Sequence, residues 1–320
     1  MRRPPRRARQ PRDGAGAATG RAVSTAAPAV AVVRAPRSTS FWAIAGRRFL
    51  RHRLAVVGLI ALAAVGGLAV FAPLLAPHGP TTIDPTQFQA PPSGTHPLGT
   101  DSVGRDVLSR LLYAGRVSLT VGLLAVAIYV VLGTVVGALA GYHGGAVDTV
   151  LSRLTDVVLS FPPLIIILFA VSIFGRPSLA NIIIVLGALG WPIVSRLVRG
   201  QFLGLRGLEF VQAARATGGS DARVVAHHLL PNAMAPVLVA ATFGTANAIL
   251  TEASLSFLGL GVQPPTPSWG NMLTDAQSLT VLERMPWLWV PPGIMILIAV
   301  LAINFVGDGL RDALDPSLRL

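Results

Sequence analysis

Cysteine and lysine are both absent from the 320 residues, and all 26 basic residues are arginine. Without cysteine, the chain has no disulfide bond, no thiolate metal site and no thiol catalysis. Without lysine, it lacks the residue with which a standard P-loop, GxxxxGK[ST], reaches nucleotide phosphates. If the protein uses ATP, we therefore expect another chain to bind it.

Charge of either sign is also scarce. Charged residues make up 12% of the chain, against about a quarter in ordinary soluble domains, while 52% of residues are hydrophobic and the mean hydropathy is +0.63. The charges are gathered into short islands between long uncharged tracts. This layout predicts an all-α, polytopic membrane helix bundle.

Six tracts have the roughly 20 mainly apolar residues that a spanning helix needs. They lie at 54–76, 117–141, 157–175, 178–195, 235–258 and 288–307. We therefore expect six transmembrane helices. The third and fourth tracts contain Pro162, Pro163 and Pro192, which membrane helices tolerate when neighbours satisfy the freed carbonyls, so we expect both to be kinked.

Residues 1–40 are rich in Arg, Pro, Ala and Gly and have too little apolar content to fold alone. We expect a disordered cytoplasmic tail that is attracted to the anionic lipid membrane. Nucleic-acid binding is not expected, because the tail has no aromatic residues for base stacking. We assign residues 41–116 to the first transmembrane helix plus an extracytoplasmic segment, and residues 117–320 to a core domain.

Arginine placement predicts the orientation, since basic residues near helix ends favour the cytoplasm. With the N-terminus inside, 21 of the 26 arginines are cytoplasmic and five are outside. Both termini are then cytoplasmic. A twin-arginine signal around Arg47 and Arg48 is the alternative, but the apolar run that follows is longer than the 7 to 15 residues of a signal peptide. We therefore expect a retained first helix in the cell membrane.

Catalytic constellations are missing from the sequence. It contains no HExxH motif and no paired-carboxylate spacing, so we expect no enzyme activity, no cofactor and no metal site. Glu252 is the one serious ionisable candidate within the apolar tracts, where such groups are expensive and usually functional. We consider structural pairing, a gating or solute-path role together with Ser256, and ion coupling.

A segment between the fourth and fifth tracts has the pattern of a short helix followed by a turn. Residues 209–216 are good helix formers, and the glycines Gly218 and Gly219 are typical of a helix stop. One small apolar face of this helix is made by Phe210, Ala213 and Ala214. Small residues permit close approach to a partner's groove.

A second short helix is expected after these glycines. Ser220 or Asp221 can cap its start, and Pro231 predicts its end. The two helices would form a helix-turn-helix elbow on the cytoplasmic side, with a small-residue knob suited to docking.

Gln212-Ala213-Ala214, followed by Gly218 and then Leu230-Pro231, resembles the EAA loop of importer-type ABC permeases. In that family the loop couples to the ATPase subunit. Gln212 stands where the loop usually has glutamate, which argues against an ion pair there but not against docking. The resemblance implies a cytoplasmic coupling loop at 199–232, with contact residues Glu209, Gln212, Ala213, Ala214, Arg215, Gly218, Asp221, Pro231 and Asn232.

Further blocks are similar to the C-type permease subunit of the peptide/nickel group. The resemblance covers about residues 45 to 320, and its blocks are HPLGTD at 96–101 with GRD at 104–106, EASLSFLGLG at 252–261, PP at 264–265 with PSWG at 267–270, and GDGLRDALDP at 307–316. Four blocks in this order make the resemblance specific.

The resemblance implies an importer-type ABC permease fold and a permease subunit of an ATP-driven importer of di- or oligopeptides. A nickel or other small-solute permease is the alternative, and an ion-coupled secondary transporter using Glu252 is an alternative of another class. The implied partners are a second homologous permease, two ATP-binding subunits and an extracytoplasmic solute-binding protein.

Overall fold

The structure is a computed structural model that describes residues 41–173 and 178–314. Within these ranges every regular element is a helix, and the extended segments form only isolated bridges. The tail expected at 1–40 lies outside the described residues.

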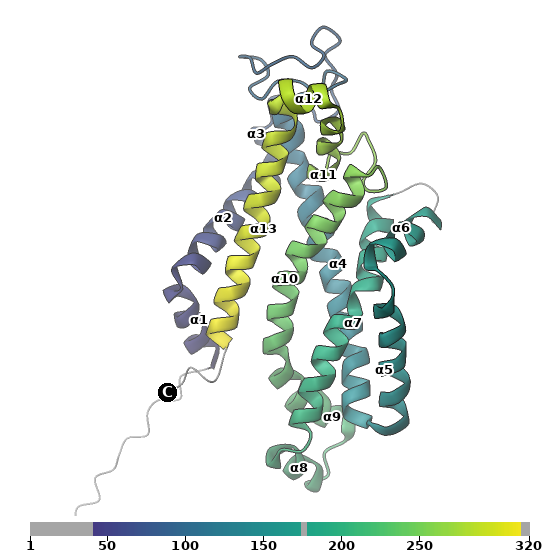
Figure 1. Ribbon diagram of the computed structural model, residues 1–320. Helices are drawn as coiled ribbons and strands as arrows, with labels where there is room; N and C mark the ends of the chain where they lie inside the picture. Colours follow the sequence, from purple (N-terminus) through teal and green to yellow (C-terminus); the bar gives the residue numbers. More distant parts are fainter. Residues whose placement is uncertain (1–40, 174–177, 315–320) are drawn as a thin grey trace, which may run out of the picture. The chain divides into compact units, whose positions relative to one another are not determined.

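Five helical segments are long and apolar enough to cross a membrane (Figure 1). They are α2 (Arg53–Val70), α4 (Val107–His143), α7 (Leu179–Leu205), the continuous path Asp221–Phe257 that ends in α10 (Leu230–Phe257), and α13 (Pro286–Leu314). They cover five of the six expected tracts. The third tract would provide the sixth span.

The third tract is broken rather than kinked. It falls on α5 (Gly145–Ser160) and α6 (Pro163–Ile173), whose axes are bent by 89° at the break. Phe161 between them has an extended backbone, with φ −95° and ψ 143°, as expected for a residue before proline. In the fourth tract, by contrast, α7 continues as one helix through Pro192.

Glycines bring α4 and α7 into close contact. A Cβ atom at Gly133 would lie 2.6 Å from Cβ of Val194, and one at Gly141 would lie 2.6 Å from Cβ of Phe202. Gly137, one helical turn from each of them, faces the same helix. Small residues at this four-residue spacing let membrane helices approach through their backbones, so this stripe sets the distance between the two helices.

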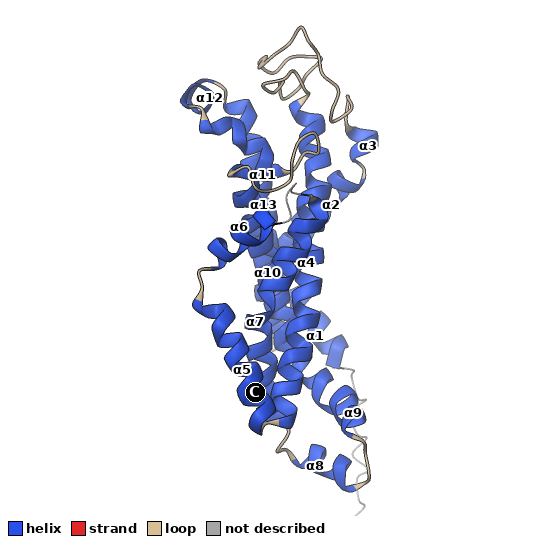
Figure 2. Cartoon of the chain, turned by 90° about the vertical axis from the view of Figure 1, so that its right-hand side faces the viewer, coloured by secondary structure: helices blue, strands red, loops and turns tan. Residues whose placement is uncertain are grey.

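Short elements occupy the two ends of the helix bundle (Figures 1 and 2). At one end lie α8 (Glu209–Ala216), α9 (Asp221–Val224) and the π-helix Val225–Leu229. At the other lie α3 (Ala72–Leu75), α11 (Trp269–Met272), the 3₁₀-helix Leu273–Gln277, α12 (Leu279–Arg284) and the loop 76–106. The remaining helix, α1 (Phe41–Arg51), packs against α13 and α2.

Candidate functional site

The expected elbow is formed by α8 and α9. Gly218 links them with a φ of +83°, a left-handed conformation that glycine adopts without steric strain. Glu209 lies in the first turn of α8 and Arg215 in the last, where both charges complement the helix dipole. The predicted helix, turn and second helix start are thus present.

The elbow is held by apolar contacts to the bundle. Val211 of α8, Val224 of α9 and Leu229 of the π-helix are fully buried in one cluster. Phe202 of α7 and Tyr142 of α4 belong to the same cluster. Burying an aliphatic side chain of this size contributes about 1.5–3 kcal/mol, so the elbow is a packed part of the fold.

Tyr142 ties both arms of the elbow to the end of α4. Its hydroxyl donates a hydrogen bond of 2.5 Å to Oδ1 of Asp221. The guanidinium of Arg215 lies over its ring, 4.9 Å from the centroid. No local pattern singles out Tyr142, apart from its being a hydroxyl-bearing side chain at the very end of an apolar tract.

The exposed surface of the elbow differs in one place from the expected knob. Phe210 is 42% exposed, and Glu209, Gln212 and Ala213 are exposed as well. Ala214, however, is half-buried and packs against the apolar cluster of its own chain. The available apolar surface is therefore Phe210 and Ala213, one helical turn apart.

The expected helix end near Pro231 is wrong. The chain continues from α9 through the π-helix into α10, and Pro231 lies in the first turn of α10, where proline's missing N–H is tolerated. The side-chain amide of Asn232 donates to the carbonyl of His228 at 2.7 Å. Pro231 and Asn232 are thus exposed residues at the start of the span.

The second candidate group, around Glu252, lies near the other end of α10. Glu252 is fully buried. The hydroxyl of Ser256 donates to its Oε1 at 2.7 Å, and that of Ser118 on α4 donates to its Oε2 at 3.1 Å. The predicted pair Glu252 and Ser256 is therefore in direct contact, with a third member from another helix.

This carboxylate group also organises the segment that follows α10. Oγ of Ser118 accepts a hydrogen bond from the backbone N–H of Trp269 at 3.2 Å, and Oγ of Ser256 accepts one from Val262 at 3.0 Å. Trp269 is fully buried, and its indole N–H donates to the carbonyl of Leu111. The network therefore fixes three segments to one another.

A polar cavity of about 330 Å³ adjoins the network and is lined by Ser256, Asp101, Arg105, Arg110 and Asp275 among others. Arg105 donates to Oδ2 of Asp101 at 2.7 Å, and Arg110 lies 3.3 Å from the same oxygen. Burial raises the pKa of Asp275. Charges of both signs line the cavity, which suits a zwitterionic solute. No local pattern groups these residues, because they come from three separate segments of the chain.

The elbow and the Glu252 group lie near opposite ends of α10. From Leu230 to Glu252 the axis of α10 rises by about 33 Å, at about 1.5 Å per residue. The residues of the expected coupling loop are together at one end of this helix, and Glu252 and Ser256 are near the other. One continuous helix thus connects the elbow to the polar cavity.

Two family models match separate ranges of the chain. Residues 133–320 match the family described as binding-protein-dependent transport system inner membrane component. Residues 40–92 match the N-terminal TM domain of oligopeptide transport permease C.

Curated relatives match over nearly their whole length. The dipeptide transport system permease protein DppC of Alkalihalophilus pseudofirmus is 42% identical over 88% of this chain and 92% of its own length. DppC of Haemophilus influenzae is 40% identical over 85% and 93%. The glutathione transport system permease protein GsiD of Pectobacterium atrosepticum is 39% identical over 87% and 91%.

A solved structure shows the same fold. A chain from inward-facing conformations of the MetNI methionine ABC transporter superimposes with a TM-score of 0.52 at 20% identity, covering 64% of this chain and 96% of that one. With the matches to the family and to the curated relatives, this likeness places the apolar helices in an importer permease. The chain belongs to the family of inner membrane components of binding-protein-dependent transport systems, as a non-enzymatic, multi-pass permease subunit.

Proposed function

We propose that this chain forms, together with a second homologous permease, the membrane path of an ATP-driven importer of di- or oligopeptides. The curated relatives described above are named for dipeptide and glutathione transport. Guanidinium and carboxyl groups line one cavity, and these are the groups that bind the two ends of a zwitterionic peptide once the pairs between them open. Nickel or ion-coupled transport has no comparable support.

The elbow is proposed as the docking surface for an ATP-binding subunit, one of two in the complex. The supporting observation is that Phe210 and Ala213 are exposed on a helix whose other face is locked to α4 and α7. A fixed helix with an exposed small-residue face transmits displacement better than a mobile loop. Glu209, Gln212, Arg215, Gly218 and Asp221 shape this elbow. Residues 199–205, which the expected coupling loop included, are the last residues of α7.

The proposal places the elbow and both termini in the cytoplasm. The polar cavity then faces the outside, where an extracytoplasmic binding protein delivers the solute. We expect this binding protein to contact the loop 76–106 and the segment around α12, because both lie at the end of the bundle opposite the elbow (Figure 1).

The test of docking is the substitution Ala213→Glu. It adds a charge to the exposed face, and an unpaired charge buried in an interface weakens binding by several kcal/mol. A loss of about 1.4 kcal/mol already lowers the association constant tenfold. We expect less than about a tenth of the wild-type amount of ATP-binding subunit to copurify with the tagged permease. Copurified subunits are quantified by mass spectrometry.

The matched control is Ala146→Glu, which adds the same charge at an exposed alanine in the first turn of α5. It should retain the wild-type amount of the ATP-binding subunit. Ala214→Glu is unsuitable, because Ala214 packs within its own chain. Wild-type retention by Ala213→Glu, with unchanged solute-stimulated ATP hydrolysis, would exclude docking through this face.

A further inference from the structure

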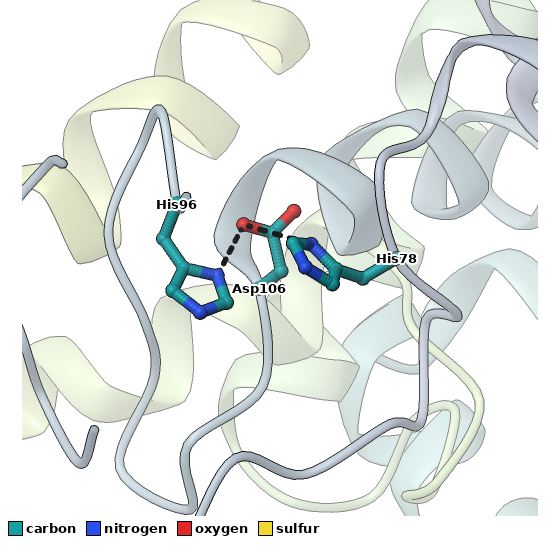
Figure 3. Close-up of side chains that lie close together, drawn as sticks. All are labelled: His78, His96 and Asp106. Atoms are coloured by element: carbon teal, nitrogen blue, oxygen red, sulfur yellow. Dashed lines mark hydrogen bonds and ion pairs between the residues drawn. The ribbon is translucent and has the colours of Figure 1, made fainter. Parts of the chain in front are cut away.

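Two histidines and one aspartate meet in the segment between α3 and α4 (Figure 3). Each of His78, His96 and Asp106 offers one ligand atom, and these atoms all lie within 4.8 Å of one another. Nδ1 of His96 lies 3.0 Å from Oδ1 of Asp106, and Nδ1 of His78 lies 4.0 Å from the same oxygen. The two imidazole rings are stacked, with centroids 4.7 Å apart.

The aspartate is fixed from behind by one serine. Asp106 caps α4, and its Oδ2 accepts hydrogen bonds of 2.7 Å from both the N–H and the hydroxyl of Ser109. The hydroxyl oxygen of Ser109 in turn accepts the backbone N–H of His78 at 3.1 Å. Oδ1 of Asp106 is thereby left to face the two imidazoles.

One atom of the cluster is unsatisfied. Nδ1 of His78 is buried and has no hydrogen-bond partner among the described residues, which is unfavourable for a buried polar atom. His96, in contrast, has a carboxylate next to its outer nitrogen. Its Nε2 lies 3.8 Å from Oδ2 of Asp84. A carboxylate behind the far nitrogen of a histidine is the usual outer partner of a metal-ligating imidazole.

We propose that His78 Nδ1, His96 Nδ1 and Asp106 Oδ1 bind one divalent transition metal ion, with Zn²⁺ as the best match. Two imidazoles and one carboxylate suit Zn²⁺, whereas Ca²⁺ and Mg²⁺ require mostly oxygen ligands. At bond lengths of about 2.0–2.2 Å, tetrahedral ligand atoms lie about 3.4 Å apart. On binding, His78 Nδ1 therefore moves closer to Asp106 Oδ1 from 4.0 Å, and His96 Nδ1 moves slightly away from 3.0 Å.

The fourth coordination position opens to a cavity of about 290 Å³, lined also by Thr82, Ile83 and Gly104. It is available to water or to an exchangeable ligand. Binding replaces the hydrogen bond between His96 and Asp106. The ligating Nδ1 of His96 carries no proton, and the single N–H of the neutral imidazole is then on Nε2, toward Asp84. The ion would tie together three points of one loop, and this inference is independent of the transport proposal.

The test uses the full chain, purified with a tag that contains no histidine and treated with EDTA. Dialysis against Zn²⁺ should load one equivalent, measured by elemental analysis. Dialysis against Co²⁺ should give the strong visible absorption of a tetrahedral nitrogen and oxygen site.

His78→Ala should lower Zn²⁺ affinity by at least about 100-fold and abolish the cobalt spectrum. Asp84→Asn, which removes only the outer partner of His96, should lower the affinity by about 10- to 100-fold. His143→Ala is the matched control, because it removes an exposed imidazole on α4 that lies outside the cluster.

His78→Ala keeps the bond between His96 and Asp106 and the cap of α4, so its thermal midpoint in EDTA should equal that of the wild type. Equal midpoints with lost metal binding support the site. Wild-type zinc affinity in His78→Ala, or the spectrum of hydrated Co²⁺ in the wild type, would overturn the proposal and leave a hydrogen-bonded cluster only.

Discussion

At the scale of single residues, Glu252 presents a buried carboxylate satisfied by two hydroxyl groups. This arrangement supports a positioning role, in which the side chain holds α4, α10 and the segment at Trp269 together. Glutamine has the same shape and can exchange hydrogen bonds with rotating serine hydroxyls. Leucine cannot.

We therefore expect Glu252→Gln to keep most of the solute uptake and most of the thermal stability of the purified protein. Glu252→Leu should lower the free energy of unfolding by about 1–3 kcal/mol for each hydroxyl that it leaves unsatisfied. Uptake assays and thermal unfolding in detergent measure the two variants side by side. If Glu252→Gln assembles normally but transports nothing, the carboxylate acts in gating or ion coupling instead.

Residues at this scale are predictable from sequence only when their partners are near in the chain. Glu252 and Ser256 are one helical turn apart, and both were expected in the candidate site. Ser118 lies 134 positions from Glu252, and Tyr142 lies 79 positions from Asp221. Contacts at such separations depend on helix packing, which no local pattern encodes. His78, His96 and Asp106 are closer in the chain, but they lie in a loop whose path no periodic pattern predicts, and no metal site was expected there.

At the scale of elements, the glycine stripe on α4 determines how closely α7 can pack. A Cβ atom at Gly137 would lie 2.8 Å from Cβ of Val198 and still closer to the backbone of Ser195. A methyl group there forces the two helices apart.

We expect Gly137→Ala to destabilise the protein by about 1–3 kcal/mol, the usual range for overpacking. Gly200→Ala on α7 is the matched control, because a Cβ at Gly200 meets no atom within 4 Å. It should be stabilising by about 0.5–1 kcal/mol through helix propensity alone. Thermal unfolding of both variants in the same detergent should show stability changes of opposite sign. A Gly137→Ala variant as stable as the wild type would contradict the role of the stripe.

Elements were predictable where apolar runs are uninterrupted, and less so at their ends. α4 begins at Val107, well before the expected tract at 117, because Arg110 and Arg116 lie within the helix. Arg110 is paired with Asp101, and Arg116 donates to the carbonyls of Ala69 and Val70. Charges satisfied by distant groups do not end a helix, although in sequence they resemble a boundary.

At the scale of the whole molecule, α4 and α7 run parallel, because Gly133, Gly137 and Gly141 face Val194, Val198 and Phe202 in the same order. The bent pair α5 and α6 therefore returns the chain to the end of the bundle at which α4 begins. This path gives six spans, with the elbow at the same end as the last residues of α4. The excess of arginine in the tail and around the elbow favours the cytoplasmic side for both.

Single introduced cysteines can decide this, because the chain has none of its own to give background labelling. We expect Gly20→Cys and Gly207→Cys to react with a membrane-impermeant maleimide only after the cells are opened, and Thr280→Cys to react in intact cells. Gly207 and Thr280 are both exposed, and a side chain at Gly207 meets no atom within 4 Å. Labelling of Gly207→Cys in intact cells, with Gly20→Cys still protected, would contradict the six-span path and would exclude the elbow from contact with a cytoplasmic ATP-binding subunit.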